Sequence, residues 1–309
     1  MEEPIMVYKQ WCSEWLNCYV KSQVKERTYE KYCHLAKAHI LPELGEYHLN
    51  ELSTAVLQQF VNTKMYQGYA SATIHGMISL LKLSLVKAVE LDIIDKEYSN
   101  YLTRPKQQLK RVECFSIYEQ RKLENFIVFI DKPKYFGVLL TLYTGIRLGE
   151  LLALEWSDLD MRKCVIKVSK SCHDSWGESG YVKVIDTPKT HTSQRIIPMP
   201  KQLVPYLKVM RRNAESKYVI PGRTDYGSGV RTYQRFFEKM LLDLGIAHKG
   251  FHSLRHTFAT RALECGMDVK TLSEILGHAN PTITLNRYAH SMFDHKTSMM
   301  NRVGKLLRR

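Results

Sequence analysis

The most informative stretch of the chain is residues 252–290, which read HSLRHTFATRALECGMDVKTLSEILGHANPTITLNRYAH. From Phe251 to the end of the chain the pattern of apolar residues predicts helices. Within the stretch, the triplet Leu276-Gly277-His278 is followed ten residues later by Tyr288. A tyrosine on a helix is most often a half-buried packing residue, so Tyr288 taken alone indicates no chemistry.

Two histidines and an arginine open the stretch. His252 and Arg255 are three residues apart and share one face of the predicted helix. His252 and His256 are four apart, a spacing also found in zinc sites, but Ser253 stands where the His-Glu-x-x-His pattern needs glutamate. Arg255 would also repel a metal dication. These residues therefore predict no zinc site.

A second segment, residues 144–154, reads TGIRLGELLAL and places Arg147 in an apolar run just after a glycine. An arginine is costly to bury without an anionic partner. Glu150 lies three residues further on, so an ion pair on a helix surface is the ordinary explanation of this pattern. A phosphate-binding arginine is the functional alternative.

A third segment, residues 187–195, reads TPKTHTSQR and contains Lys189. It lies between two predicted strands, 181–186 and 194–199, which are rich in Val and Ile. Lys189 is therefore expected on a hairpin loop, where a single lysine is usually only solvated.

The rest of the chain predicts a mainly α protein with a small antiparallel β-sheet. Four amphipathic helices are expected in the first hundred residues: one carrying Trp11 and Trp15, one from Thr28 that stops before Pro42, one capped by Ser53 or Thr54, and one over 72–90. A capping-box pattern starts a further helix at Ser116, and a third strand is expected over 164–170. The predicted boundaries are a helical domain over 1–103, a basic linker over 104–112 and a mixed domain over 113–309.

Composition narrows the function. The chain has 309 residues, a formal net charge of +14 and a pI of about 9.3, which suits a polyanionic partner. Residues 1–112 hold 14 basic and 12 acidic residues, so most of the surplus lies beyond them. Seven cysteines without a Cys-x-x-Cys pair favour neither disulfides nor a thiolate zinc site. Phosphate-binding glycine motifs are absent, and the longest charge-free run, Met65–Leu81, is too polar for a membrane span.

Taken together and in this order, the segments resemble the tyrosine recombinase family, also called the phage integrase family, and within it the integrases of mobile elements and prophages. The resemblance covers nearly the whole chain and is strongest over 252–290, with the patterns H-x-L-R-H, L-G-H and Tyr. It implies an N-terminal helical, SAM-like core-binding domain and a C-terminal catalytic domain. The catalytic residues it implies are Arg147, Lys189, His252, Arg255, His278 and Tyr288.

The same resemblance implies a site-specific DNA recombinase that works through a 3′-phosphotyrosyl intermediate and a Holliday junction. Tyr288 is expected as nucleophile, Lys189 as general acid, the two arginines and His278 as phosphate ligands, and His252 as a helper of proton transfer. His256 and Glu150 are expected to support the site structurally. No cofactor or metal is expected.

The expected partner is double-stranded DNA at attachment-type sites, bound by a homotetramer in the cytoplasm, with a DNA-bending accessory protein or excisionase as a further partner and no membrane. Three alternatives stay open: a chromosome-dimer resolvase of the same family, a catalytically silent architectural or regulatory DNA-binding protein, and a topoisomerase that only relaxes supercoils.

Overall fold

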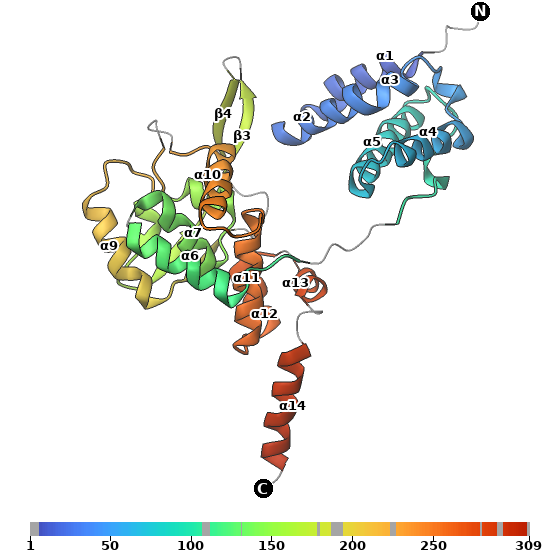
Figure 1. Ribbon diagram of the computed structural model, residues 1–309. Coiled ribbons are helices and arrows are strands. Elements are labelled where there is room, and N and C mark those ends of the chain that lie inside the picture. Colours follow the sequence, from blue (N-terminus) through green and yellow to red (C-terminus); the bar gives the residue numbers. More distant parts are fainter. Residues whose placement is uncertain are drawn as a thin grey trace, which may run out of the picture. The chain divides into compact units, whose positions relative to one another are not determined.

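The computed structural model describes residues 6–106, 112–130, 132–177, 180–186, 194–222, 227–278, 280–288 and 293–307. The chain divides into two compact units, Met1–Lys110 and Arg111–Arg309 (Figure 1). The predicted fold class is confirmed, since both units are mostly helical and, among the described residues, the strands lie in the second.

The first unit is a small helical bundle whose core is closed by aromatic side chains. Tyr8 and Trp11 are fully buried, and the Trp11 indole donates to the backbone oxygen of Ser84 at 3.0 Å. Ser53 caps its helix as predicted, because its hydroxyl accepts from the backbone N–H of Val56. The helices are α1 (Tyr8–Glu14), continued by a π-helical turn (Trp15–Val20), α2 (Glu26–Leu35), continued by a second (Ala36–Ile40), α3 (Leu41–Leu44), α4 (Thr54–Tyr66) and α5 (Ser71–Glu90).

The segment from Glu26 ends before Pro42, as expected, but the chain does not leave the helical conformation there. Pro42 is in the first turn of α3, where a missing N–H costs no hydrogen bond. The proline therefore separates two helical segments instead of opening a loop.

Helix α5 is long and apolar enough to span a membrane by length and composition, which the sequence analysis did not find. The charge-free run considered there ends at Leu81, and α5 continues past Lys82 and Lys87. Ile74, Met77 and their neighbours on α5 are buried in the core of the first unit. This burial is typical of the central helix of a folded bundle.

The second unit packs helices around a larger apolar core that includes Leu140, Ile146, Leu152 and Leu254. The capping box predicted at Ser116 is present, with Ser116 and Glu119 exchanging hydrogen bonds of 2.8 and 3.2 Å. The helices are α6 (Ile117–Ile130), α7 (Pro133–Thr144), α8 (Leu148–Ala153), α9 (Val204–Arg212), α10 (Val230–Asp243), α11 (His252–Glu264), α12 (Val269–Leu276), α13 (Pro281–Tyr288) and α14 (Phe293–Leu307).

The strands form two antiparallel sheets rather than one. The first has the order β1 (Leu159–Asp160), β2 (Val165–Val168) and β5 (Arg195–Pro198), and the second pairs β3 (Ser171–Gly177) with β4 (Gly180–Asp186). Strand β3 was not predicted, because its sequence is polar and it depends on pairing with β4 along its whole length.

This topology corrects the expectation of a hairpin around Lys189. The flanking strands β4 and β5 lie in different sheets and pair with β3 and β2, respectively. The segment that joins them is therefore not the turn of a two-stranded hairpin. Residues 187–193, Lys189 among them, lie outside the described residues.

Candidate active site

Two helices of the second unit end at glycines that the backbone requires. Helix α7 ends at Gly145 and α12 at Gly277, each with φ of 65°. Such left-handed caps favour glycine because a Cβ is strained there. A Cβ at Gly145 would also lie 2.5 Å from the Phe258 ring. The two glycines therefore let the chain reverse sharply beside α11 and beside β5.

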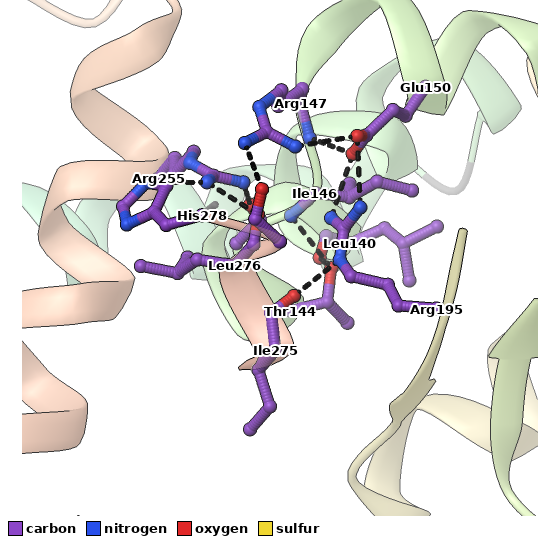
Figure 2. Close-up of polar contacts among 12 residues, drawn as sticks. Leu140, Thr144, Ile146, Arg147, Glu150, Arg195, Arg255, Ile275, Leu276 and His278 are labelled. Carbon is purple, nitrogen blue, oxygen red and sulfur yellow. Dashed lines mark hydrogen bonds and ion pairs between the residues drawn. The ribbon is translucent and has the colours of Figure 1, made fainter. Parts of the chain in front are cut away.

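The reversed turns point backbone carbonyls at Arg255, which projects from α11. This arginine is only 2% exposed and donates to the carbonyl oxygens of Gly145 and Leu276, both at 2.7 Å (Figure 2). The C-terminal ends of helices carry partial negative charge, which stabilises a buried guanidinium. Here that stabilisation comes from α7 and α12 together.

Arg147 approaches the same turn from the other side. It precedes α8, and its guanidinium donates to Glu150 at 2.8 Å and to the carbonyl oxygen of Gly277 at 2.8 Å. The pair with Glu150 exists as the sequence suggested, but it is not a surface pair, because the glutamate side chain is only 4% exposed. Arg147 keeps 33% of its side chain exposed, so it can still meet a ligand from solution.

Glu150 is held by a second arginine that the sequence analysis did not single out. Arg195, at the start of β5, forms a bidentate pair with its carboxylate at 2.8 and 2.9 Å, and its Nε donates to the carbonyl oxygen of Ile275 at 2.6 Å. The sequence does show a charged residue at the start of a strand rich in isoleucine. It does not show that β5 packs against α12, which places the carbonyl oxygen of Ile275 within reach of Arg195.

Burial and charge act in opposite directions on Glu150. Burial raises the pKa of its carboxyl, but the hydrogen bonds and charge of Arg195, with the charge of Arg147, outweigh it and hold the pKa below the usual value. Glu150 is therefore a fixed anion that orients two guanidinium groups.

His278 follows the Gly277 turn and uses both ring nitrogens. Nε2 lies 3.0 Å from Nη2 of Arg255, and Nδ1 lies 2.7 Å from the hydroxyl of Thr284 on α13. A guanidinium can only donate, so Nε2 must be the acceptor. In the neutral ring the proton is therefore on Nδ1, and Nδ1–H donates a hydrogen bond to the hydroxyl of Thr284. Thr284 is fully buried, and no sequence signal marked it.

The structure thus brings three of the six predicted residues together: Arg147, Arg255 and His278 all contact the turn around Gly277. His252 is exposed at the start of α11, and the contact described for it is an edge-on one with the His256 ring, 4.6 Å between centroids. His256 itself is buried.

Tyr288 is the last residue of α13, but its side chain lies outside the described part of the structure, and so does all of Lys189. The roles of Tyr288, Lys189 and His252 therefore stay predictions. Among the described residues, no cluster of three or more His, Cys, Asp or Glu has the geometry of a metal site.

The described cluster combines the guanidinium groups of Arg147, Arg195 and Arg255 with the carboxylate of Glu150, so positive charges outnumber negative ones (Figure 2). Arginine binds phosphate oxygens through two parallel donors and stays charged at all relevant pH values. The fold and the site therefore define a helical protein with an arginine-rich cluster whose chemistry suits an anion, followed along the chain by a helix that ends in a tyrosine.

Comparison of the sequence with known protein families identifies the family of this protein. The sequence profile of the phage integrase family matches residues 118–295, and that of the phage integrase N-terminal SAM-like domain matches residues 7–65. The chain belongs to the phage integrase family, and the predicted identity as an integrase-type tyrosine recombinase is confirmed.

Individual relatives agree. The chain is 28% identical to a "Tyrosine recombinase XerC-like" protein of Caldanaerobacter subterraneus, over 94% of this chain and 81% of that one. It is 27% identical to the "Transposase from transposon Tn916" of Enterococcus faecalis, over 85% and 69%. Its fold is similar to that of the Tn1549 transposon integrase solved with transposon right end DNA, with a TM-score of 0.81, 24% identity and coverage of 97% and 100%.

Proposed function

We propose that this protein is a site-specific integrase that cuts and rejoins duplex DNA through a covalent 3′-phosphotyrosyl intermediate. One observation carries the proposal. Arg147, Arg255 and His278 meet at the Gly277 turn, and the chain leads directly from this turn into α13, whose last residue is Tyr288.

The proposed reaction depends on stabilising the negative charge of the phosphate in the transition state. The Tyr288 oxygen attacks the phosphorus, an O–P bond to tyrosine forms, and the bond to the 5′ oxygen breaks. Negative charge grows on the non-bridging oxygens, and the guanidinium groups of Arg147 and Arg255 offset it. A free tyrosine has a pKa of ~10, and nearby cations make its deprotonation easier.

Protons must move at both ends of this reaction. Lys189 donates one to the departing 5′ oxygen as general acid, His252 assists at the nucleophile, and His278 donates a hydrogen bond to the phosphate. The phosphotyrosyl ester keeps the energy of the phosphodiester, so a 5′-hydroxyl from a partner duplex can reverse the step. One round of exchange gives a Holliday junction and a second round resolves it. The 3′-phosphotyrosyl link and the free 5′-hydroxyl make the strand cleavage type IB chemistry.

In this proposal residues 1–103 form the core DNA-binding domain, joined by a linker over 104–112 to a catalytic domain over 113–309. The two profile matches, one on each side of the linker, support the division. Relatives that act in transposons, and a similar structure in complex with DNA, support double-stranded DNA of a mobile element as the substrate. Work on such DNA implies a cytoplasmic location, with a bending protein or an excisionase as accessory partner.

Helix α14 supports assembly into a tetramer on DNA. Its Met300, Leu306 and Leu307 are 68%, 76% and 77% exposed, and apolar side chains this exposed are typical of a surface that another chain covers. A chain truncated before Phe293 should still bind one DNA site but should fail to form the tetramer. Mass photometry on a two-site duplex would measure this, and unchanged tetramers would contradict the role of α14.

The test of the proposed function is covalent capture. The purified protein is incubated with DNA from the ends of its element, with chelator and without nucleotide, then denatured with detergent and recovered. Wild type should retain DNA, and Tyr288→Phe should retain none, because the nucleophilic oxygen is gone. Tyr118→Phe, which alters an exposed tyrosine on α6, serves as the matched control and should behave as wild type.

Sequencing the captured DNA would locate the cleavage site. Equal retention by wild type and Tyr288→Phe would show that Tyr288 is not the nucleophile. Retention by neither, with native DNA binding intact, would favour the architectural alternative. In that case a substrate already nicked beside the site would test strand cleavage directly.

A further inference from the structure

Thr284 occupies a position that links two parts of the active site. It lies on α13 four residues before Tyr288, one helical turn away, and six residues after His278. Its side chain is fully buried, and its hydroxyl lies 2.7 Å from Nδ1 of His278. The nucleophile's helix and the histidine therefore meet at the Thr284 hydroxyl group.

The Arg255 contact and the Thr284 hydroxyl favour the same protonation form of the His278 ring. Arg255 presents an N–H to Nε2 at 3.0 Å, and this contact is a hydrogen bond only while Nε2 carries a lone pair. That condition places the proton of the neutral ring on Nδ1, where it needs an acceptor. In this buried place Thr284 supplies the acceptor, and a buried N–H without one would cost a desolvation penalty.

We propose that Thr284 is a positioning residue that holds His278 in the Nδ1–H form, with Nε2 turned toward the arginines and toward the phosphate they bind. The inference rests on the proposed function and deepens it. When a phosphate oxygen replaces Arg255 as the partner of Nε2, that nitrogen takes a proton from solvent and becomes the donor. Nδ1–H stays hydrogen-bonded to the Thr284 hydroxyl throughout, so the ring needs no rotation.

Three substitutions separate the hydroxyl from its surroundings. Thr284→Val keeps the branched shape and removes the hydroxyl. Thr284→Ser keeps the hydroxyl and removes the methyl group. Thr282→Val makes the same chemical change at an exposed position of the same helix. The hydrogen bond described for Thr282 is donated by its backbone N–H to Asn280, and the substitution leaves that N–H in place.

The first measurement needs no DNA and no activity. Nitrogen NMR of histidine-labelled full-length protein reports which ring nitrogen carries the proton, and His278→Gln identifies the signal. Wild type, Thr284→Ser and Thr282→Val should show Nδ1 protonated. Thr284→Val should move the proton to Nε2 and turn the ring away from Arg255, since a buried Nδ1–H would have lost its acceptor. A wild-type signal with Nε2 protonated, or an unchanged signal in Thr284→Val, would overturn the inference.

The second measurement is the single-turnover rate of covalent capture. Thr284→Val should be slower than wild type by about 10- to 100-fold, the usual cost of losing a group that orients an active-site ligand. Thr284→Ser should recover most of that loss. If serine were as slow as valine, the packing of the threonine and not its hydroxyl would matter, and the inference would be wrong. Failure of wild type itself to capture DNA would instead count against the proposed function, and the NMR result would still decide the inference.

Discussion

Replacing Arg195 with methionine should destabilise the second unit by about 3 kcal/mol at neutral pH, the lower end of the range for breaking a buried ion pair, because Glu150 loses its bidentate partner but keeps its contact with Arg147. The side chains of Arg195 and Glu150 are 6% and 4% exposed, so solvent cannot replace the lost partner. The substitution also removes the hydrogen bond to Ile275, which ties the end of α12 to β5. Urea unfolding followed by hydrogen exchange of peptides from α7 and α11 would report on the second unit by itself.

The effect of Arg195→Met should shrink in acid. In the wild type the pKa of Glu150 is lowered, so its contribution to stability is full above the pKa of an unfolded glutamate and is lost as pH falls through the lower folded value. In the variant the pKa-lowering effect of Arg195 is gone, and burial, which raises the pKa of Glu150, is opposed by the charge and the backbone hydrogen bond of Arg147. The carboxyl therefore takes up a proton at a higher pH than in the wild type, which removes the poorly compensated charge and narrows the difference in stability between the two proteins.

Two controls make the Arg195 result specific. Lys167→Met removes an exposed cation from β2, the strand that pairs with β5, and should change stability by no more than about 0.5 kcal/mol. The double variant Arg195→Met with Glu150→Gln should recover much of the loss, since it leaves no buried carboxylate that has lost its bidentate partner. An Arg195→Met protein as stable as the Lys167→Met protein would contradict the structural role of the pair.

Replacing Arg147 with lysine should slow formation of the covalent intermediate by about 10²–10³-fold, the typical cost of losing one donor to transition-state charge. Lysine keeps the positive charge but replaces the planar guanidinium, whose separate nitrogens contact Glu150 and Gly277, with one ammonium nitrogen that cannot bind a phosphate in the same bidentate way. The fold should persist, because Glu150 keeps its bidentate partner Arg195 and its hydrogen bond from the backbone N–H of residue 147.

Single-turnover capture assays at saturating DNA would measure this rate. Arg212→Lys, the same substitution at an exposed position of α9, is the matched control and should leave the rate unchanged. DNA binding by Arg147→Lys should fall far less than its rate, because most of the affinity for duplex DNA comes from many phosphate contacts. A rate equal to that of Arg212→Lys would remove Arg147 from the proposed machinery.

Much of the fold follows from local sequence. The spacing of Trp11 and Trp15, the cap at Ser53 and the capping box at Ser116 all gave helices where they were predicted, because these signals act within one or two turns of chain. The sheet was less predictable. Strand β3 is polar and is held by its register with β4, and the hairpin expected around Lys189 gave way to a connection between two sheets.

By itself, the sequence determined the family and the order of the motifs, and it singled out Arg147, Arg255 and His278. Apart from the local pair of Arg147 with Glu150, it could not determine what those side chains contact. The bond from Arg147 to Gly277 spans 130 positions, and that from Arg255 to Gly145 spans 110. Such pairs form only when α7, α11 and α12 pack together. Arg195 and Thr284 were missed for the same reason, since an ordinary strand residue and an ordinary helix residue acquire their roles from the buried partners that the tertiary structure brings to them.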